Sequence, residues 1–398
     1  MSNLINDPKN KKIVEVIISE IKKKNLIEYK KEIGKGGFSK VFEVVYKSYI
    51  LVCKMQILKE KEPTTNVKKK NIENEMNLIT KINHINIIKT LFIFKNEVTL
   101  KVKKKIKKDN SYQIKDDKET YLVYNILMEK ASYFDLAVFG FYFHNSYLLR
   151  QSNKRNNIKY LNNLSQILIL NFIQQILSGI YYLKQYNYVT FDLKPENIVL
   201  TNNLIIKLID FSLMGKIFVN NYIDKKIKCI NDEKNFRLSF KSTFSIMGPE
   251  YYDENKKNIS YENLEKIEIF SLGCIIYFLI FNKNVYDNKY KHDISFNKNK
   301  NIEILEESKK KLKEKKYYDE ELFDFIEKCL NKNIEERFSI QNCLEKEFIY
   351  KANKKYRKIM NHNYNEKTKI FIELQKLDQL KKIKKHKRFK FKKLKNIN

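Results

Sequence analysis

Cysteine is scarce in this chain of 398 residues, and no pair of cysteines has the spacing of a metal site. The sequence contains no Cys-x-x-Cys pair, and no histidine cluster adjoins a cysteine. This arrangement argues against a zinc site and is typical of reduced, intracellular thiols. The five cysteines are Cys53, Cys229, Cys274, Cys329 and Cys343.

Long hydrophobic runs are missing as well. The longest one, Ile269 to Phe281, is shorter than the roughly 20 residues that a membrane span needs, so it predicts a buried helix. Residues 1–10 are polar and do not resemble a secretory signal. We therefore expect an intracellular protein, cytoplasmic or nuclear, without a transmembrane segment.

Glycine, proline and acidic residues are also few, whereas lysine is abundant. The chain has 8 Gly and 4 Pro, and its 79 Lys and Arg outnumber 47 Asp and Glu, which gives a net charge of +32. Part of this bias is typical of an AT-rich genome. The excess of basic residues in 350–398 is larger than this bias explains, with 18 basic and 3 acidic residues. Such a tail attracts nucleic acid, an anionic membrane or an acidic protein, although a disordered, solvated tail explains it nearly as well.

Residues suited to catalysis are concentrated in the stretch Tyr188 to Leu200, YVTFDLKPENIVL, between two apolar ends. Asp192 can accept a proton, Lys194 can neutralise developing negative charge, and Asn197 can offer an oxygen to a metal ion. A second motif, Asp-Phe-Ser at 210–212, follows it in the chain. A polar turn between two strands would explain the first motif alone, but not both motifs in this order.

These motifs resemble those of eukaryotic-type protein kinases of the serine/threonine class, with Thr-Phe-Asp in place of His-Arg-Asp and Asp-Phe-Ser in place of Asp-Phe-Gly. The resemblance implies an α+β, bilobal fold, with a small β-rich N-lobe that holds one main helix and a larger helical C-lobe. ATP and Mg²⁺ are the implied cofactors. Asp192 would position the substrate hydroxyl, while Asn197 and Asp210 would hold Mg²⁺. A lysine after Asp-Leu, here Lys194, is similar to the motif of the serine/threonine class rather than to that of the tyrosine class.

A second group of residues resembles the nucleotide-binding half of this family. Residues 33–41 form an expected hairpin, and its glycines allow backbone N–H groups to approach phosphates closely. Ser39 stands at the position of the third glycine in the Gly-rich loop of the family. Lys54 would bind the α- and β-phosphates. Met128 would be the gatekeeper, with backbone groups of the following residues at the adenine. The implied nucleotide-binding residues are Gly34, Gly36, Val41, Val52, Lys54, Glu75, Met128, Glu129, Ala131, Asp135 and Val199.

Glu75 lies in a helix expected over residues 72–82, and the resemblance implies that it pairs with Lys54. Glu73 is a rival on the same helix, but at 100° per residue it lies about 160° around the axis from Glu75. A surface salt bridge is the plain interpretation of Glu73. Residues 95–120, between two expected strands, are polar and lysine-rich and are interpreted as an inserted loop.

Further motifs of the resemblance concern the helical half. Glu250, at the end of a long activation segment, is expected to form a buried, structural ion pair with Arg337. Glu268 replaces the usual Asp and would cap the backbone of the catalytic loop. Phe191 replaces an arginine that reads a phosphate on the activation segment, so this switch is expected to be missing. Thr190 replaces a histidine and should leave a smaller packing contact.

The expected domains are a helical extension over residues 1–26, a kinase domain over 27–349 and a basic tail over 350–398. Within the kinase domain, the N-lobe would take 27–129 and the C-lobe 130–349. Apolar residues recur at helical spacing in the extension, which predicts a helix that packs on the small lobe. A partner-binding role for that helix is the alternative.

Three functions are compatible with these motifs. The first is a kinase that transfers the γ-phosphate of Mg-ATP to Ser or Thr of protein substrates, since every reacting group is present. The second is a pseudokinase that acts as a nucleotide-binding or scaffold module, with the tail on an anionic partner, since four motif positions depart from the family. In the third, the tail carries the main function and the kinase domain is accessory. The motifs do not specify the substrate, the activating signal or the oligomeric state.

Overall fold

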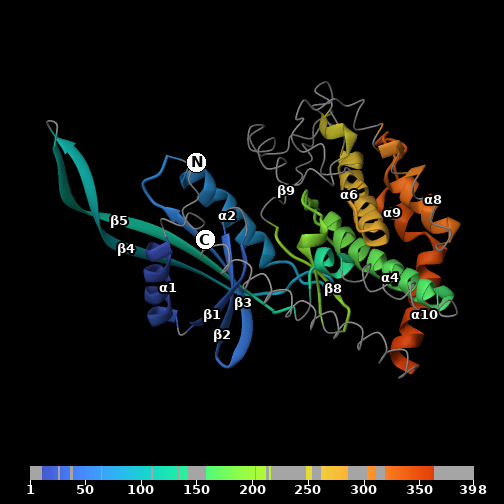
Figure 1. Ribbon diagram of the computed structural model, residues 1–398, viewed down its shortest axis with the longest axis horizontal. Helices are drawn as coiled ribbons and strands as arrows, with labels where there is room; N and C mark the ends of the chain where they lie inside the picture. Colours follow the sequence, from blue (N-terminus) through green and yellow to red (C-terminus); the bar gives the residue numbers. More distant parts are fainter. Residues whose placement is uncertain are drawn as a thin grey trace, which may run out of the picture. The chain divides into compact units, whose positions relative to one another are not determined.

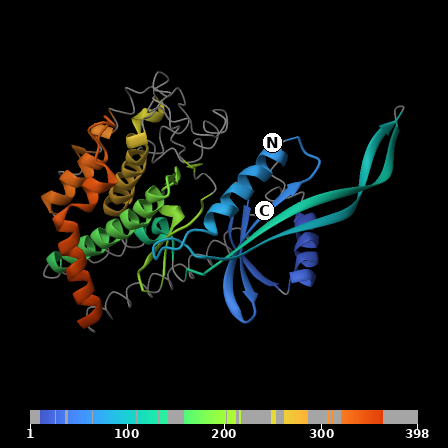
Figure 2. The same cartoon turned by 180° about the vertical axis from the view of Figure 1, so that it is seen from behind.

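The computed structural model describes two compact units of the chain. The first unit is Met1–Ser132 with Ile209–Ser212, and the second is Tyr133–Leu208 with Leu213–Asn398. Figures 1 and 2 show the two units from opposite sides, the first mainly in blue and teal. The described residues are 11–25, 27–35, 39–63, 65–108, 111–131, 134–141, 158–201, 203–211, 215–216, 248–252, 261–285, 303, 305–307, 309–310 and 319–362.

The first unit is built on one antiparallel sheet with the strand order β1-β2-β3-β5-β4 (Figure 1). Most residues of β2 and β3 are β-branched, aromatic or otherwise apolar, which favours strands that are buried on at least one face. Helix α1 contacts β1 and β4, and helix α2 contacts β3. The bounds are α1 Lys11–Asn25, β1 Ile27–Lys35, β2 Ser39–Tyr46, β3 Tyr49–Lys59, α2 Thr65–Ile79, β4 Thr90–Lys108 and β5 Ser111–Met128.

Helix α1 is part of the core of the first unit. Val14, Ile17 and Ile21, which lie on one helical stripe, are buried in a cluster with residues of the sheet. Val16, on the opposite side of the helix, remains 47% exposed. The prediction that this stripe packs on the β-rich part of the protein is therefore confirmed.

Residues 95–120 are not the inserted loop that their composition predicted. Strands β4 and β5 pair without interruption from the sheet out to Lys108 and Ser111. Asp109 and Asn110, which separate the strands in the sequence, are both turn-forming types. The high lysine content concealed the strand signal, which is an alternation of apolar and polar residues. The apolar residues at alternate positions of β4 are Val98, Leu100 and Val102.

The second unit is mainly helical, with short strand pairs beside the helices. Strand β6 pairs with β9, and β7 pairs with β8. Helix α4 contacts α6, α9 and α10, so it lies at the centre of the helical packing (Figure 1). The bounds are α4 Ile158–Gln185, β6 Tyr188–Val189, η3 Pro195–Asn197, β7 Ile198–Leu200, β8 Ile206–Leu208, β9 Gly215–Lys216, η5 Pro249–Tyr252, α6 Tyr261–Phe281, α8 Glu320–Cys329, α9 Ile340–Leu344 and α10 Glu347–His362.

The apolar run Ile269 to Phe281 forms the second half of α6 and is buried on nearly all sides, as its composition predicted. A Cβ atom at Gly273 of this helix would lie 2.9 Å from the side chain of Leu330, so only glycine permits this packing. Within the described residues, one stretch, Gln166–Gln185 of α4, is long and apolar enough to cross a membrane, and 72% of its most apolar window is buried inside the protein.

Helix α10 crosses the expected boundary between the kinase domain and the tail at residue 349. It continues to His362 and packs on α4, where Asn171 donates a 2.6 Å hydrogen bond to Asn353. Ala352 and Tyr356 are buried on the same side of the helix. Residues 350–362 of the expected tail therefore belong to the packed helical unit, and the rest of the tail lies outside the described residues.

We predict that Ile17→Ala lowers the free energy of opening of the first unit by about 2–5 kcal/mol, because it leaves a cavity in the core. Hydrogen exchange of the amides of β1 to β3 measures this opening. Val16→Ala is the matched control, since it removes a similar side chain from the exposed side of α1, and it should change exchange by less than about 0.5 kcal/mol. Equal effects of the two substitutions would show that α1 does not belong to this core.

Candidate active site

The register of the sheet aligns three of the residues expected at the nucleotide. Gly34 of β1 lies opposite Val41 of β2, and Val41 lies opposite Lys54 of β3. A Cβ atom at Gly34 would lie 3.4 Å from Val41, which is an ordinary van der Waals contact, so the pairing of the two strands does not itself require glycine. Gly36, which was expected beside them, lies outside the described residues.

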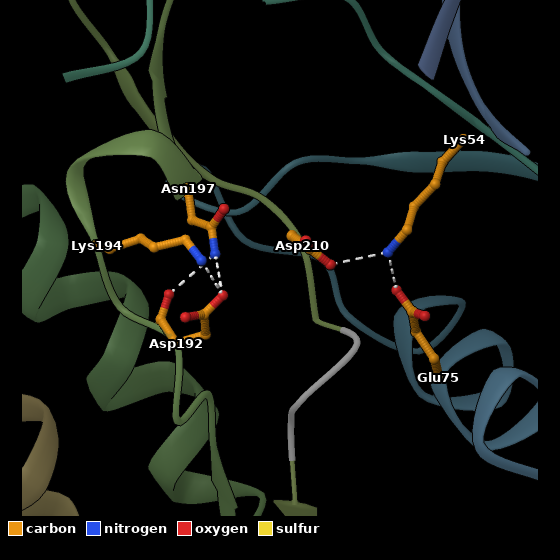
Figure 3. Close-up of polar contacts among 6 residues, drawn as sticks. All are labelled: Lys54, Glu75, Asp192, Lys194, Asn197 and Asp210. Carbon is orange, nitrogen blue, oxygen red and sulfur yellow. Dashed lines mark hydrogen bonds and ion pairs between the residues drawn. The ribbon is translucent and has the colours of Figure 1, made fainter. Parts of the chain in front are cut away.

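Lys54 lies between two carboxylates of the first unit (Figure 3). Its Nζ atom is 2.7 Å from Oε1 of Glu75 on α2 and 2.8 Å from Oδ1 of Asp210. The Lys54 and Glu75 side chains are only 8% and 6% exposed, whereas that of Asp210 is 33% exposed. The predicted pairing of Lys54 with Glu75 is confirmed, and Asp210 is a second partner that the motifs did not reveal.

The buried ammonium and the two carboxylates shift each other's pKa. Burial lowers the pKa of Lys54, but the charges of Asp210 and Glu75 raise it by more, so it stands above its ordinary value. Burial raises the pKa of Glu75, against the opposing effect of Lys54. Because two carboxylates share one cation, Lys54 keeps its charge over the whole physiological pH range.

Glu73 does not compete for Lys54. It accepts a 3.3 Å hydrogen bond from the hydroxyl of Tyr124 and lies 3.6 Å from Nζ of Lys95 on β4. Both side chains of this ion pair are more than 40% exposed. The interpretation of Glu73 as a surface salt-bridge partner is confirmed.

Asp210 reaches the first unit because the stretch Ile209–Ser212 returns to it from the second unit. The backbone of Asp210 has a φ of 64°, in the left-handed region, which aspartate tolerates better than most residues do. Phe211 is buried directly after it. Ser212, which replaces the usual glycine, lies outside the described residues.

The catalytic loop of the second unit brings Asp192, Lys194 and Asn197 together (Figure 3). Lys194 donates to Oδ2 of Asp192 at 2.6 Å, and the amide nitrogen of Asn197 donates to the same oxygen at 2.8 Å. Asn197 also donates to the carbonyl oxygen of Asp192 at 3.0 Å. The short helix η3 allows this, because its tight turn carries Asn197 back toward Asp192.

Glu268 of α6 binds the backbone at the start of this loop. It is 1% exposed and accepts a 2.8 Å hydrogen bond from the backbone N–H of Thr190, so the expected cap is confirmed. The hydroxyl of Thr190 donates to the same carboxylate oxygen, a hydrogen bond that sequence reasoning missed. Burial raises the pKa of Glu268 to about 7, although both Thr190 hydrogen bonds oppose the shift.

Phe191, between Thr190 and Asp192, has a φ of 55° and a buried side chain. A bulky residue in the left-handed region is strained by roughly 1–2 kcal/mol. The strain persists because the residues on either side are held by Glu268 and by the catalytic cluster.

The backbone after β5 is fixed by a reciprocal pair of hydrogen bonds. The N–H of Glu129 donates to the carbonyl of Lys89 at 3.0 Å, and the N–H of Lys89 donates to the Glu129 carboxylate at 2.9 Å. Upstream of this pair, Met128 lies opposite Val52 in the sheet. Glu129 and Ala131, which are expected to contact adenine, therefore follow a strand end that these hydrogen bonds hold in place.

Asp135 and Val199 are brought together in the second unit by an isolated β-bridge. The carboxylate of Asp135 accepts a 2.7 Å hydrogen bond from the N–H of Val138, which is the geometry of a helix N-cap. Asp135 thus has a structural role in addition to the ribose contact implied by the resemblance.

Comparison with known proteins agrees with this geometry. A family model described as the protein kinase domain matches residues 27–349. The chain belongs to the protein kinase family. Its fold is the bilobal α+β fold of that family, with a β-sheet unit and a helical unit.

The chain is similar, at low identity, to several proteins that are named as kinases. It is 23% identical over 269 residues to an Aurora kinase of Saccharomyces cerevisiae, covering 66% of this chain and 56% of the relative. It is 28% identical over 347 residues to a probable serine/threonine-protein kinase of Dictyostelium discoideum, covering 83% of this chain and 66% of the relative. It is 27% identical over 325 residues to calcium-dependent protein kinase 4 of Plasmodium falciparum, covering 80% of this chain and 48% of the relative. The kinase thus spans about half to two thirds of these relatives.

The predicted ion pair of Glu250 and Arg337 is present in the helical unit of the kinase and is bidentate. Arg337 donates to the two carboxylate oxygens at 2.7 and 2.8 Å, and both side chains are buried. The guanidinium also donates to the carbonyl of Lys266 and stacks 4.8 Å from the ring centroid of Phe270, both on α6. The Arg337 guanidinium therefore links η5 to α6, the helix that carries Glu268.

We predict that Lys54→Met lowers the unfolding free energy of the kinase by about 3–5 kcal/mol, because it leaves buried Glu75 without its cation. The double variant Lys54→Met/Glu75→Gln should recover part of this loss, since it also removes the stranded charge. Urea unfolding of the four proteins of this cycle is the measurement.

Lys95→Met on β4 is the matched control. Lys95 and its partner Glu73 are 42% and 43% exposed, so the loss should stay near 0–1 kcal/mol. A loss equal to that of Lys54→Met would contradict the assignment of Lys54 as a buried ion-pair centre.

We predict that Glu268 makes the kinase less stable as the pH rises from about 5 to 8. A carboxyl whose pKa is raised to about 7 in the folded protein favours folding below its ordinary pKa of 4.5 and loses this contribution as the pH passes 7. Relative to Glu268→Gln, the wild type should lose on the order of 2–3 kcal/mol over this range.

Glu336→Gln is the control for this measurement, because hydrogen bonds from Asn333 and Asn331 lower the pKa of the exposed Glu336 carboxyl. That variant should reproduce the wild-type pH profile above pH 5. Parallel profiles for wild type and Glu268→Gln would refute the raised pKa.

Proposed function

We propose that this kinase is an active enzyme that transfers the γ-phosphoryl group of ATP to serine or threonine hydroxyls of protein substrates, with Mg²⁺ as its metal. The observation that carries the proposal is the double ion pair of Lys54 with Glu75 and Asp210. Protein kinases act only when this Lys–Glu pair is in place, because the ammonium must meet the ATP phosphates in a fixed position.

Asn197 and Asp210 suit Mg²⁺, which prefers oxygen ligands. The amide nitrogen of Asn197 donates to Asp192, so the amide oxygen is the atom that can face a cation. Asp210 supplies a carboxylate that is part-exposed, unlike the buried Glu75. When bound, Mg²⁺ would offset negative charge on the phosphates during transfer.

Asp192 is the residue proposed to receive the proton of the substrate hydroxyl. Lys194 and Asn197 both donate to its Oδ2, which fixes the plane of the carboxylate and orients its other oxygen. Lys194 also places a positive charge beside the loop, where it can stabilise the negative charge of the transferring group. These residues position and stabilise, which is the main work in phosphoryl transfer.

The pseudokinase alternative rests on the departures at Thr190, Phe191, Ser212 and Glu268. Two of them compensate each other, because the longer Glu268 accepts from both the N–H and the hydroxyl of Thr190. The loop is therefore held in spite of the missing motif histidine. This compensation, with every reacting group retained, favours the active enzyme.

We predict that wild-type kinase with Mg-ATP phosphorylates a generic protein substrate, and that Asp192→Asn lowers the rate by at least about 10²–10⁴-fold, because the general base is removed. Lys54→Met and Asp210→Asn should abolish the activity. Incorporation of labelled phosphate, followed by phosphoamino acid analysis, measures both the rate and the Ser/Thr preference.

Asp324→Asn, the same chemical change at an exposed position of α8, is the control and should keep wild-type activity. A wild-type rate no faster than that of Asp192→Asn would reject the proposal. If Mg-ATP still raised the unfolding temperature in that case, the chain would be a nucleotide-binding pseudokinase.

A further inference from the structure

A row of side chains crosses the sheet of the first unit next to Lys54. Glu43 of β2 lies opposite Val52 of β3, and Val52 lies opposite Met128 of β5. Directly paired residues point to the same face of a sheet, and so do residues two positions apart along a strand. Glu43 therefore shares its face with Lys54, Val52 and Met128, which are three of the residues implied at the nucleotide.

The opposite face of the same strands is covered by helix α1. Phe42 and Cys53, which alternate with these positions, are buried there in one cluster with the helix. Val52, on the face of Lys54, is only partly buried. The face that carries Lys54 and Glu43 is therefore the less covered one, which suits the binding of a ligand.

Two lysines meet the Glu43 carboxylate on this face. Nζ of Lys130 lies 2.7 Å from Oε2 of Glu43, and Nζ of Lys31 lies 3.6 Å from the same oxygen. The Glu43 side chain is 15% exposed, that of Lys130 is 35% exposed and that of Lys31 is 65% exposed. The hydrogen bond from Lys130, helped by the charges of both lysines, holds the pKa of Glu43 below its ordinary value against the effect of burial. Glu43 is therefore ionised at neutral pH.

The ion pair of Lys130 and Glu43 crosses β3. In the sheet, β3 lies between β2 and β5 (Figure 1), so these two strands are about 10 Å apart at ~4.8 Å per strand spacing. Lys130 follows the end of β5 at Met128 by two residues and reaches a carboxylate on β2. The pair thus fixes the segment after β5 to a strand that is not its own neighbour.

The residue before Lys130 is held from the other side of β5. Glu129 exchanges hydrogen bonds with Lys89, which directly precedes β4. The strand order places β4 on one side of β5, and β3 and β2 on the other. Two consecutive residues are therefore tied in opposite directions. An ordinary surface ion pair would explain the contact of Lys130 with Glu43 alone, but not this double restraint on the segment that is expected at the adenine.

We propose that Lys130 and Glu43 are positioning residues for the nucleotide base: their ion pair holds the backbone of residues 129–131 against the edge of adenine and gives this kinase its preference for ATP over GTP. This inference rests on the proposed function. Adenine carries an amino donor where guanine carries a carbonyl acceptor, so a backbone that is held in one position matches only one of the two bases. A site built to hydrogen-bond one group rejects an analogue that cannot pair with it.

The test measures nucleotide affinity of the full chain with Mg²⁺, by fluorescence of mant-ADP and its displacement with ATP or GTP. Lys130→Met and Glu43→Gln should each raise the Kd for ATP by about 5- to 30-fold, because a charge-assisted hydrogen bond is lost. The Kd for GTP should rise by less than about threefold, because guanine does not use the same backbone groups. The double variant should bind ATP no more weakly than the weaker single variant, since both remove one interaction. Lys130→Arg, which keeps the charge, should retain the preference.

Lys31→Met is the matched control. It removes the same charge from the same carboxylate oxygen, but Lys31 lies on β1 and not in the segment after β5. Because Lys31 is mostly exposed, this variant should change the Kd for either nucleotide by less than about twofold. In a phosphorylation assay, Lys130→Met should raise KM for ATP by more than it lowers kcat, as expected for a residue that acts on binding rather than on the reacting atoms.

Equal weakening of ATP and GTP binding by Lys130→Met would overturn the proposal, because it would reflect a general loss of attraction for phosphates. Equal effects of Lys31→Met and Lys130→Met would overturn it for the same reason. Binding does not require phosphoryl transfer, so the two proposals fail separately. A chain that shows the predicted ATP preference but transfers no phosphate rejects the proposed function alone. A chain that transfers phosphate while Lys130→Met keeps the wild-type ratio of ATP to GTP affinity rejects this inference alone.

Discussion

The buried charge of Lys54 is the constraint on which the rest of the first unit depends. An ammonium group that is removed from water must be paired, because the free energy of burying it alone is prohibitive. Glu75 meets this need from α2, and Asp210 meets it from a stretch that returns to the sheet after a long excursion through the other unit. The position of α2 and the path of residues 209–211 are thus consequences of one side chain on β3.

A similar constraint organises the second unit. Besides its own buried apolar residues, its catalytic loop is held by buried polar groups that lie far away in the sequence. Glu268 of α6 binds Thr190, and Arg337 binds Glu250 while it also contacts α6. Helix α6 is therefore a rigid base from which two separate polar links fix the loop and η5. Because each link is buried, removal of one partner leaves a costly unpaired group, which makes these links structural requirements.

The exchange at Thr190 and Glu268 shows how a motif can change while its mechanical role is kept. Glutamate is longer than aspartate by one methylene, and threonine has a hydroxyl that reaches the same oxygen as its own backbone N–H. Each substitution alone would alter the distance or the number of hydrogen bonds to the loop. Together they preserve the cap, at the expense of a buried carboxyl whose pKa lies near neutrality.

Short motifs and local periodicity predicted the catalytic loop around Asp192 and the buried stripe of α1. The pairings of Lys54 with Glu75 and of Glu250 with Arg337 were implied by the resemblance to protein kinases. Only the packed structure shows that residues 95–108 and 111–120 are strands, that Asp210 also binds Lys54, and that the Thr190 hydroxyl binds Glu268. The physical reason is that these interactions join residues far apart in the sequence. A lysine-rich strand differs from a loop only through its pairing partner, and a buried polar group finds its partner only when distant segments pack together.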